Sequence, residues 1–194
     1  MTTVPEGSVV HPPQPGVPGA VRTIEVARGA GSGPTRLAAF DAALACAGVA
    51  DFNLVRLSSV IPAATTVVPV GSRVAGVSGE WGDRVYVVLA EMRVDRPGQQ
   101  AWAGLGWVQE PRSGKGLFVE HEGHSEEAVR RDLQRSLAWV TASRGLAFDS
   151  PRYEVQGVEC GEAPACALVV AVYGSDRWTQ PVVNLPWLPP FSSG

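Results

Sequence analysis

Two adjacent serines, Ser58 and Ser59, are the residues whose type and position best suit chemistry. They follow an apolar segment that begins at Asn53 and reads Asn-Leu-Val-Arg-Leu-Ser-Ser-Val-Ile-Pro. A run rich in Val, Leu and Ile predicts a strand, and Pro62 cannot donate to a central ladder, so we expect the strand to end on the serine pair. For an arbitrary pair of serines, an ordinary turn is the simpler interpretation.

Two carboxylates are candidates for a site that includes these serines. Glu120 lies in Gly-Leu-Phe-Val-Glu-His-Glu-Gly, residues 116–123, and Asp41 lies in Leu-Ala-Ala-Phe-Asp-Ala-Ala-Leu, residues 37–44. On the residues alone, Glu120 is the solvent side of an alternating strand and Asp41 is the polar face of a helix. A role in chemistry needs a further signal.

That signal is a resemblance carried by the segments 37–44, 53–62 and 116–123 together. They resemble the pyruvoyl-dependent arginine decarboxylases, in which a Leu-Asn-Ala-Phe-Asp-x-Ala-Leu helix precedes Asn-Leu-Val and Ser-Ser-Ile-x-Pro, and Gly-x-x-x-Glu-x-x-Gly follows. The similarity covers roughly residues 21–175. Ala38 departs from the family's frequent Asn, and Pro62-Ala63-Ala64 departs from a stretch that commonly has a second proline and then a glycine or basic residue.

The resemblance implies a chain that cuts itself between Ser58 and Ser59 and makes its own cofactor. The Ser59 hydroxyl would attack the Ser58 carbonyl carbon and convert the peptide bond to an ester. β-Elimination would then leave dehydroalanine, which hydrolyses to a pyruvoyl group derived from Ser59. This ketone would condense with the α-amino group of an amino acid and accept electrons as carbon dioxide leaves, the role of pyridoxal phosphate elsewhere. The implied reaction converts arginine to agmatine and carbon dioxide, a step toward polyamines.

The resemblance also gives the two carboxylates roles. Glu120 would be the general acid that protonates the carbanion after carbon dioxide leaves, with Glu122 or His121 as the next candidates. Asp41 would bind the guanidinium of the substrate, because arginine offers two parallel donors to the two oxygens of a carboxylate. No metal ligand is implied.

Asn53 is a third residue that the resemblance marks as needed for cleavage or catalysis. In an extended strand it would lie about 20 Å from Ser59, at roughly 3.3 Å per residue. We therefore expect either that Asn53 completes the site of a neighbouring subunit or that the chain bends sharply between the two residues. The family assembles as trimers with active sites between subunits, so the implied partners are two further copies of this chain.

Three other functions remain possible on the sequence. The chain could be an unprocessed, non-catalytic relative with a structural or regulatory role, or a decarboxylase for another amino acid. The glycines at 29, 31 and 33 could also indicate dinucleotide binding. However, the third glycine of Gly-x-Gly-x-x-Gly would fall at Pro34 and no series of βαβ units follows, so we expect a flexible loop that leads into a helix.

Composition limits the class of protein. A chain of 194 residues with 45% hydrophobic residues predicts one well-buried core. The net charge of −3, with scattered Lys and Arg, argues against a nucleic-acid partner. No apolar stretch is long enough to span a membrane and no secretory signal is evident, so we expect a cytoplasmic protein. The odd set of three cysteines, at 46, 160 and 166, suits a reducing compartment, and the spacing of Cys160 and Cys166 is not that of a zinc site.

The expected elements place these residues in one α+β domain. We predict a flexible tail over residues 1–20, a single domain over 21–180 and a Pro-rich tail over 181–194. One helix should open at Pro34 and Thr35 and end at Gly48, and a second should run from Ser125 to Gly145. Alternating or apolar segments predict mainly antiparallel strands. Together with the resemblance, they predict a four-layer αββα sandwich of antiparallel or mixed sheets. The expected strands cover residues 21–27, 53–59, 66–70, 85–94, 101–109, 116–121, 152–159 and 165–174.

Overall fold

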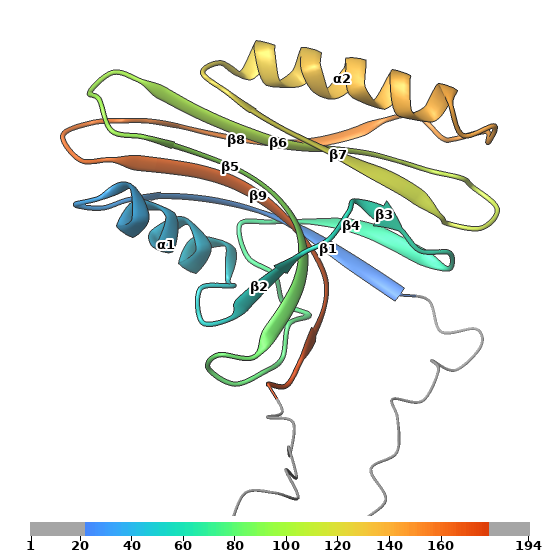
Figure 1. Ribbon diagram of the computed structural model, residues 1–194, viewed down its shortest axis with the longest axis horizontal. Coiled ribbons are helices and arrows are strands. Elements are labelled where there is room, and N and C mark those ends of the chain that lie inside the picture. Colours follow the sequence, from blue (N-terminus) through green and yellow to red (C-terminus); the bar gives the residue numbers. More distant parts are fainter. Residues whose placement is uncertain (1–21, 179–194) are drawn as a thin grey trace, which may run out of the picture.

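The protein is described by a computed structural model over residues 22–178, in which two sheets pack face to face and each is covered on its outer side by a helix (Figure 1). The tails expected at 1–20 and 181–194 lie outside the described residues. The elements, in chain order, are β1 (Arg22–Ser32), α1 (Arg36–Ala47), β2 (Asn53–Arg56), β3 (Val60–Ile61), β4 (Thr65–Gly71), β5 (Arg84–Val94), β6 (Gln100–Gln109), β7 (Gly116–Gly123), α2 (Glu126–Ala142), β8 (Arg152–Glu159) and β9 (Ala165–Asp176).

Four layers follow one another in the order α1, five-stranded sheet, four-stranded sheet, α2 (Figure 1). The five-stranded sheet has the order β2-β5-β9-β1-β4 and the four-stranded sheet has the order β3-β7-β6-β8. The first sheet is mixed, because β1 with β4 and β2 with β5 are parallel pairs, while the pairs of the second sheet are antiparallel. The expected four-layer α+β sandwich is confirmed.

Alternation along the strands gives this sandwich three apolar layers. Leu168 and Val170 of β9 face α1, whereas Val169 and Ala171 face the four-stranded sheet. On β6, Leu105 faces the other sheet, and the residues of the opposite parity face α2. Burial on both faces explains why β9 is apolar almost throughout, since a strand between two layers has no solvent side.

Both helices begin at the residues that the sequence predicts. Thr35 caps α1 by accepting the N–H of Ala38, and Ser125 caps α2 by accepting the N–H of Ala128. Gly48 ends α1 in the left-handed conformation, with φ 82°. The expected end of α2 at Gly145 is late, because the regular helix stops at Ala142.

The predicted loop over the glycines at 29, 31 and 33 is wrong over residues 29–32, because β1 continues to Ser32. A Cβ atom on Gly29 would lie 2.2 Å from the Ala43 carbonyl oxygen, and one on Gly31 would lie 2.4 Å from the Ala43 nitrogen. These glycines therefore allow α1 to pack directly on the strand. They serve the contact between helix and sheet and form no phosphate-binding turn.

The predicted strand from Asn53 to the serine pair is wrong over its last part, because β2 ends at Arg56. β2 pairs with β5 in the five-stranded sheet, and β3, which follows the serines, pairs with β7 in the four-stranded sheet. Residues 57–59 connect the two, so the serine pair lies where the chain crosses from one sheet to the other (Figure 1).

Within residues 22–178, no helix is both long enough and apolar enough to cross a membrane. The three cysteines are free thiols, with Cys46 exposed and Cys160 and Cys166 buried in different apolar clusters.

Candidate active site

Ser59 adopts a strained backbone conformation at the crossing between the sheets. Its φ is 67°, in the left-handed region that residues with a Cβ atom rarely occupy. Such a conformation costs on the order of 1–3 kcal/mol and persists only when its surroundings fix it. Here its surroundings are β3 on one side and β7 on the other.

The Ser59 hydroxyl donates to the carboxylate of Glu120. Its Oγ atom lies 2.9 Å from Oε1 and 3.0 Å from Oε2 of Glu120. Glu120 is thus within hydrogen-bonding distance of the hydroxyl that the implied cleavage would use as its nucleophile. The two residues are 61 positions apart in sequence and meet because β3 and β7 are neighbours.

Strand alternation on β7 explains why Glu120 faces the serine. Phe118 and Glu120 point to the same side of the strand, toward the five-stranded sheet. Phe118 is buried in the layer between the sheets, whereas Glu120 lies farther along the strand and is exposed. The carboxylate therefore stands at the rim of the inter-sheet core.

His121, a reserve candidate for the acid, points to the other side of β7. Its Nε2 atom lies 2.7 Å from the Ser136 hydroxyl on α2. Glu122 shares the face of Glu120 by parity and is exposed, so it remains the next candidate.

Two further hydrogen bonds hold the backbone that follows the serine pair. The Phe118 N–H donates to the Ser59 carbonyl at 2.8 Å, and the Tyr173 hydroxyl on β9 donates to the Val60 carbonyl at 3.1 Å. Burial, with a smaller effect from the charge of Glu120, raises the pKa of the Tyr173 hydroxyl well above its ordinary value. The phenol therefore stays protonated and acts as a donor.

Asn53 is not brought to Ser59 within one chain. The parallel pairing of β2 continues through the N–H of Leu57, which donates to the Val87 carbonyl. The chain between Asn53 and Leu57 is therefore extended over roughly 13 Å, at about 3.3 Å per residue. The Asn53 amide donates to the Gly82 carbonyl at 2.6 Å, at the far end of the strand.

Asp41 is also not brought to Ser59 within one chain. It is exposed on α1, which covers the outer face of the five-stranded sheet, whereas Ser59 belongs to the opposite side of that sheet. Leu37, one helical turn before Asp41, is 68% exposed. Together the two side chains form an apolar and acidic surface on α1.

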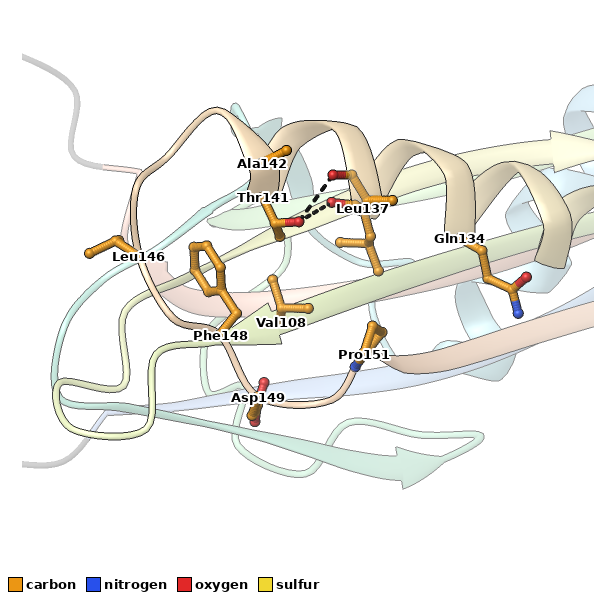
Figure 2. Close-up of a pocket in the computed structure, with 10 residues that line it drawn as sticks. Val108, Gln134, Leu137, Thr141, Ala142, Leu146, Phe148, Asp149 and Pro151 are labelled. Atoms are coloured by element: carbon orange, nitrogen blue, oxygen red, sulfur yellow. Dashed lines mark hydrogen bonds between the residues drawn. The ribbon is translucent and has the colours of Figure 1, made fainter.

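A pocket of about 420 Å³ between α2 and β6 lies away from these residues (Figure 2). Its lining is mostly apolar, with Val108, Leu137 and Phe148 among its residues. Its carboxylate, Asp149, accepts the Gln109 N–H and pairs with Arg152. The Asp149 side chain is thus used to fasten the chain after α2, and the pocket contains no part of the Ser59 site.

Tyr173 and the Phe118 N–H were missed by sequence reasoning. Tyr173 ends an apolar run and looks like a core residue, and its contact with Val60 spans 113 positions. The one available signal is that a buried Tyr usually hydrogen-bonds its hydroxyl. That rule gives no partner.

Comparisons with known proteins identify the family of the chain. The sequence model of the pyruvoyl-dependent arginine decarboxylases (PvlArgDC) matches residues 23–189. A pyruvoyl-dependent arginine decarboxylase of Halobacterium salinarum strain R1 is 41% identical over 158 residues, which cover 78% of this chain and 93% of the relative. One from Methanocaldococcus jannaschii is 30% identical over 154 residues, covering 77% and 87%, and one from Methanothermobacter thermautotrophicus is 32% identical over 128 residues, covering 65% and 80%.

The family match covers most of the chain, including the serine pair, the strand that carries Glu120 and the helix that carries Asp41. The chain therefore belongs to the pyruvoyl-dependent arginine decarboxylase family.

Proposed function

We propose that this protein is a self-cleaving decarboxylase that converts arginine to agmatine and carbon dioxide, using a pyruvoyl group made from Ser59. The observation that carries the proposal is the hydrogen bond from the Ser59 hydroxyl to both oxygens of Glu120. It joins the nucleophile needed for cleavage to a carboxylate that can exchange protons with it. The family to which the chain belongs supports the same reaction.

Self-cleavage begins at the strained crossing. The Ser59 hydroxyl gives its proton toward Glu120 as its oxygen bonds to the Ser58 carbonyl carbon. The bond from that carbon to the Ser59 nitrogen then breaks, the nitrogen takes up a proton, and an ester joins the two residues. Relief of the left-handed strain at Ser59 favours this step, because the peptide bond that helps to hold the conformation is lost.

Elimination completes the cut. Loss of the Ser59 α-proton and departure of the Ser58 carboxylate leave dehydroalanine at position 59, and hydrolysis releases ammonia to leave a ketone. The former Oγ atom departs as one oxygen of the Ser58 carboxylate. The Ser59 carbonyl, held by the Phe118 N–H, becomes the amide carbonyl next to the new ketone.

Position 59 suits a pyruvoyl group. The Ser59 carbonyl already accepts a hydrogen bond from the Phe118 N–H. The Glu120 carboxyl is hydrogen-bonded to the Ser59 Oγ atom, which is two bonds from the Cα atom that becomes the ketone carbon. When formed, the group supplies a ketone that condenses with the substrate amine and takes up the electron pair as carbon dioxide leaves. Glu120 then holds the proton that returns to the substrate carbon, a task for a positioned general acid.

Recognition of arginine is assigned to the surface of α1 that carries Asp41 and Leu37. A carboxylate matches a guanidinium through two parallel hydrogen bonds, and an exposed leucine one turn away suits the aliphatic part of an arginine side chain. In a single chain this surface is separated from Ser59 by the five-stranded sheet. The substrate can bridge the two only if Asp41 comes from another copy.

Asn53 leads to the same arrangement. Its amide is bound at the end of β2 that is remote from Ser59, so its role in cleavage or catalysis must be exerted in a neighbouring site. We therefore propose a homotrimer of cleaved protomers with its active sites between subunits, as the family resemblance implies. The three free thiols fit a cytoplasmic location, and the substrate is a small molecule with no nucleic acid or membrane required.

Subunit mixing tests the shared site. Asn53→Ala and Ser59→Ala chains should each be inactive alone, and exchange of their subunits should restore part of the decarboxylation, because some sites then receive an intact residue from each chain. Exchange is confirmed independently by mass analysis of mixed trimers. Exchange without any recovered activity would overturn the shared site while leaving self-cleavage itself unaffected.

A further inference from the structure

We infer that Tyr173 is a positioning residue that anchors the chain end created by cleavage, through the hydrogen bond from its hydroxyl to the Val60 carbonyl. The inference rests on the proposed self-cleavage and adds to it a residue that neither the sequence motifs nor the proposed mechanism contains. The distance between the two oxygens is 3.1 Å.

The need for an anchor follows from the short segment that remains after the cut. Before cleavage, residue 59 is tied covalently to β2 through residues 57 and 58. Afterwards it is the first residue of a new chain, attached to β3, which has only two residues. Val60 is 55% exposed, so its side chain contributes little burial, and the first deeply buried side chain is Ile61. Chain ends of this kind are poorly ordered unless they are tied down.

Few contacts fix the new end. The Ser59 carbonyl accepts from the Phe118 N–H, and the Val60 carbonyl accepts from Tyr173. One donor belongs to β7 of the four-stranded sheet and the other to β9 of the five-stranded sheet. The two carbonyls are therefore held from two sides, which fixes the orientation of the peptide that links residues 59 and 60.

Tyr173 is itself held firmly enough to serve this purpose. Its ring packs against the Phe118 ring, with centroids 6.2 Å apart and planes at 58°. The residue directly follows Val172, which pairs with Glu25 of β1 and with Val87 of β5. A hydroxyl placed by a ring contact and by a paired neighbouring residue can hold a mobile end at low entropic cost, because the donor is already in place.

The consequence concerns the distance between position 59 and Glu120. Without the Tyr173 hydroxyl, the new end retains a single backbone bond and the pairing of a two-residue strand. The group at position 59 could then move away from the Glu120 carboxyl, and the Phe118 N–H would open to solvent more often. Exchange of the Phe118 amide hydrogen thus reports directly on the anchor.

Tyr173→Phe tests the inference because it keeps the ring and removes only the hydroxyl. Amide exchange at Phe118 is measured by NMR in four proteins: the cleaved wild type, cleaved Tyr173→Phe, and the uncut forms of both in a Ser59→Ala background. We expect the Phe118 amide hydrogen to exchange about fivefold faster in cleaved Tyr173→Phe than in the cleaved wild type. This factor corresponds to the net free energy of one hydrogen bond. In the uncut pair the difference should be much smaller, since the peptide bond still holds residue 59.

Tyr153→Phe is the matched control. Tyr153 lies on β8 and packs on the α2 side of the four-stranded sheet, away from Ser59. Its variant should leave Phe118 exchange unchanged in both the cut and the uncut protein. Decarboxylation per mole of ketone should fall in Tyr173→Phe with the KM for arginine unchanged, because the substrate contacts are elsewhere.

Each outcome decides between defined alternatives. Equal exchange at Phe118 in the cleaved wild type and cleaved Tyr173→Phe overturns the inference, and so does an equal increase in cut and uncut protein, which would mark Tyr173 as a general packing residue. A wild-type chain that never cuts overturns the proposed function together with this inference. Cut chains with equal exchange overturn this inference alone.

Discussion

Replacing Glu120 by Gln separates the two tasks that the site gives to this residue. Gln has nearly the same shape and its side-chain oxygen can still accept the Ser59 hydroxyl, but it can neither take up a proton as a base nor deliver one as an acid. Sequence reasoning assigns Glu120 only to turnover and predicts that the variant still cleaves. The contact of Ser59 with both carboxylate oxygens adds an effect on cleavage.

The sizes of the two effects should differ. A hydrogen bond to a charged group is worth about 1.5–3 kcal/mol and one to a neutral group about 0.5–1.5 kcal/mol. In the variant, the hydrogen bond that orients the Ser59 hydroxyl is therefore weaker by on the order of 1.4 kcal/mol. Each such loss corresponds to about a factor of ten in rate. Cleavage should therefore slow at least tenfold, because the lost proton acceptor adds to the lost orientation, and still reach completion. Turnover should fall about a hundredfold or more, since a positioned general acid contributes at least that factor.

The assay follows both steps in the same sample. Denaturing electrophoresis over time gives the cleavage rate, titration of the ketone gives the number of active chains, and release of carbon dioxide from arginine gives turnover per active chain. Glu122→Gln is the matched comparison on the same face of β7. Unchanged turnover in Glu120→Gln would refute the reasoning, and a loss in Glu122→Gln instead would move the acid to that residue.

Three other changes test separate parts of the structure. Asp41→Ala should raise the KM for arginine in steady-state assays, because the loss of the charge partner of the guanidinium costs a few kcal/mol of binding free energy. Turnover of amino acids with apolar side chains should not change. Equal losses on all substrates would mean that Asp41 is structural. Gly31→Ala should lower the free energy of unfolding by about 1–3 kcal/mol or more in a denaturant titration, because its Cβ would lie 2.4 Å from the Ala43 nitrogen; wild-type stability would contradict the close packing of α1 on β1. The backbone N–H groups of residues 80 and 178 lower the pKa of Asp83, so its contribution to stability is present above the ordinary carboxyl pKa of about 4 and is lost as the pH falls through the lower folded value. Asp83→Asn should therefore weaken the acid dependence of unfolding below about pH 4, and an unaltered dependence would exclude this role.

Local signals in the sequence predicted the beginning of both helices, the end of α1 and the bounds of β8. Thr35, Gly48 and Ser125 act through their own side chains or backbone freedom within a few residues, so their effect is visible without knowledge of the fold. The strand over residues 152–159 also has the predicted bounds, because alternation is a local pattern.

Features that depend on contacts between distant segments were not predictable in the same way. Gly29 and Gly31 look like a loop until α1 is known to lie against them, and only then does the missing Cβ become a packing requirement. Apolar residues stand on both sides of the serine pair, and nothing local indicates that the residues before it and those after it join different sheets.

The candidate site shows the same division. The resemblance to a family marks Ser59 and Glu120, but the physical reason for their pairing is the neighbouring position of β3 and β7. It also marks Asp41 and Asn53, whose distance from Ser59 in the folded chain becomes apparent only when the layers are assembled. Tyr173 has no local mark at all, because its partner lies on another sheet.

The most direct test of self-cleavage is the intact mass of the purified wild-type, Ser58→Ala and Ser59→Ala chains after incubation. The wild type should separate into two fragments divided between Ser58 and Ser59, with a ketone at the start of the second. Ser58→Ala should also divide, since it keeps the carbonyl that is attacked, and Ser59→Ala should remain one chain. A wild-type protein that stays whole, or a Ser59→Ala protein that still divides at this bond, would contradict the proposed chemistry.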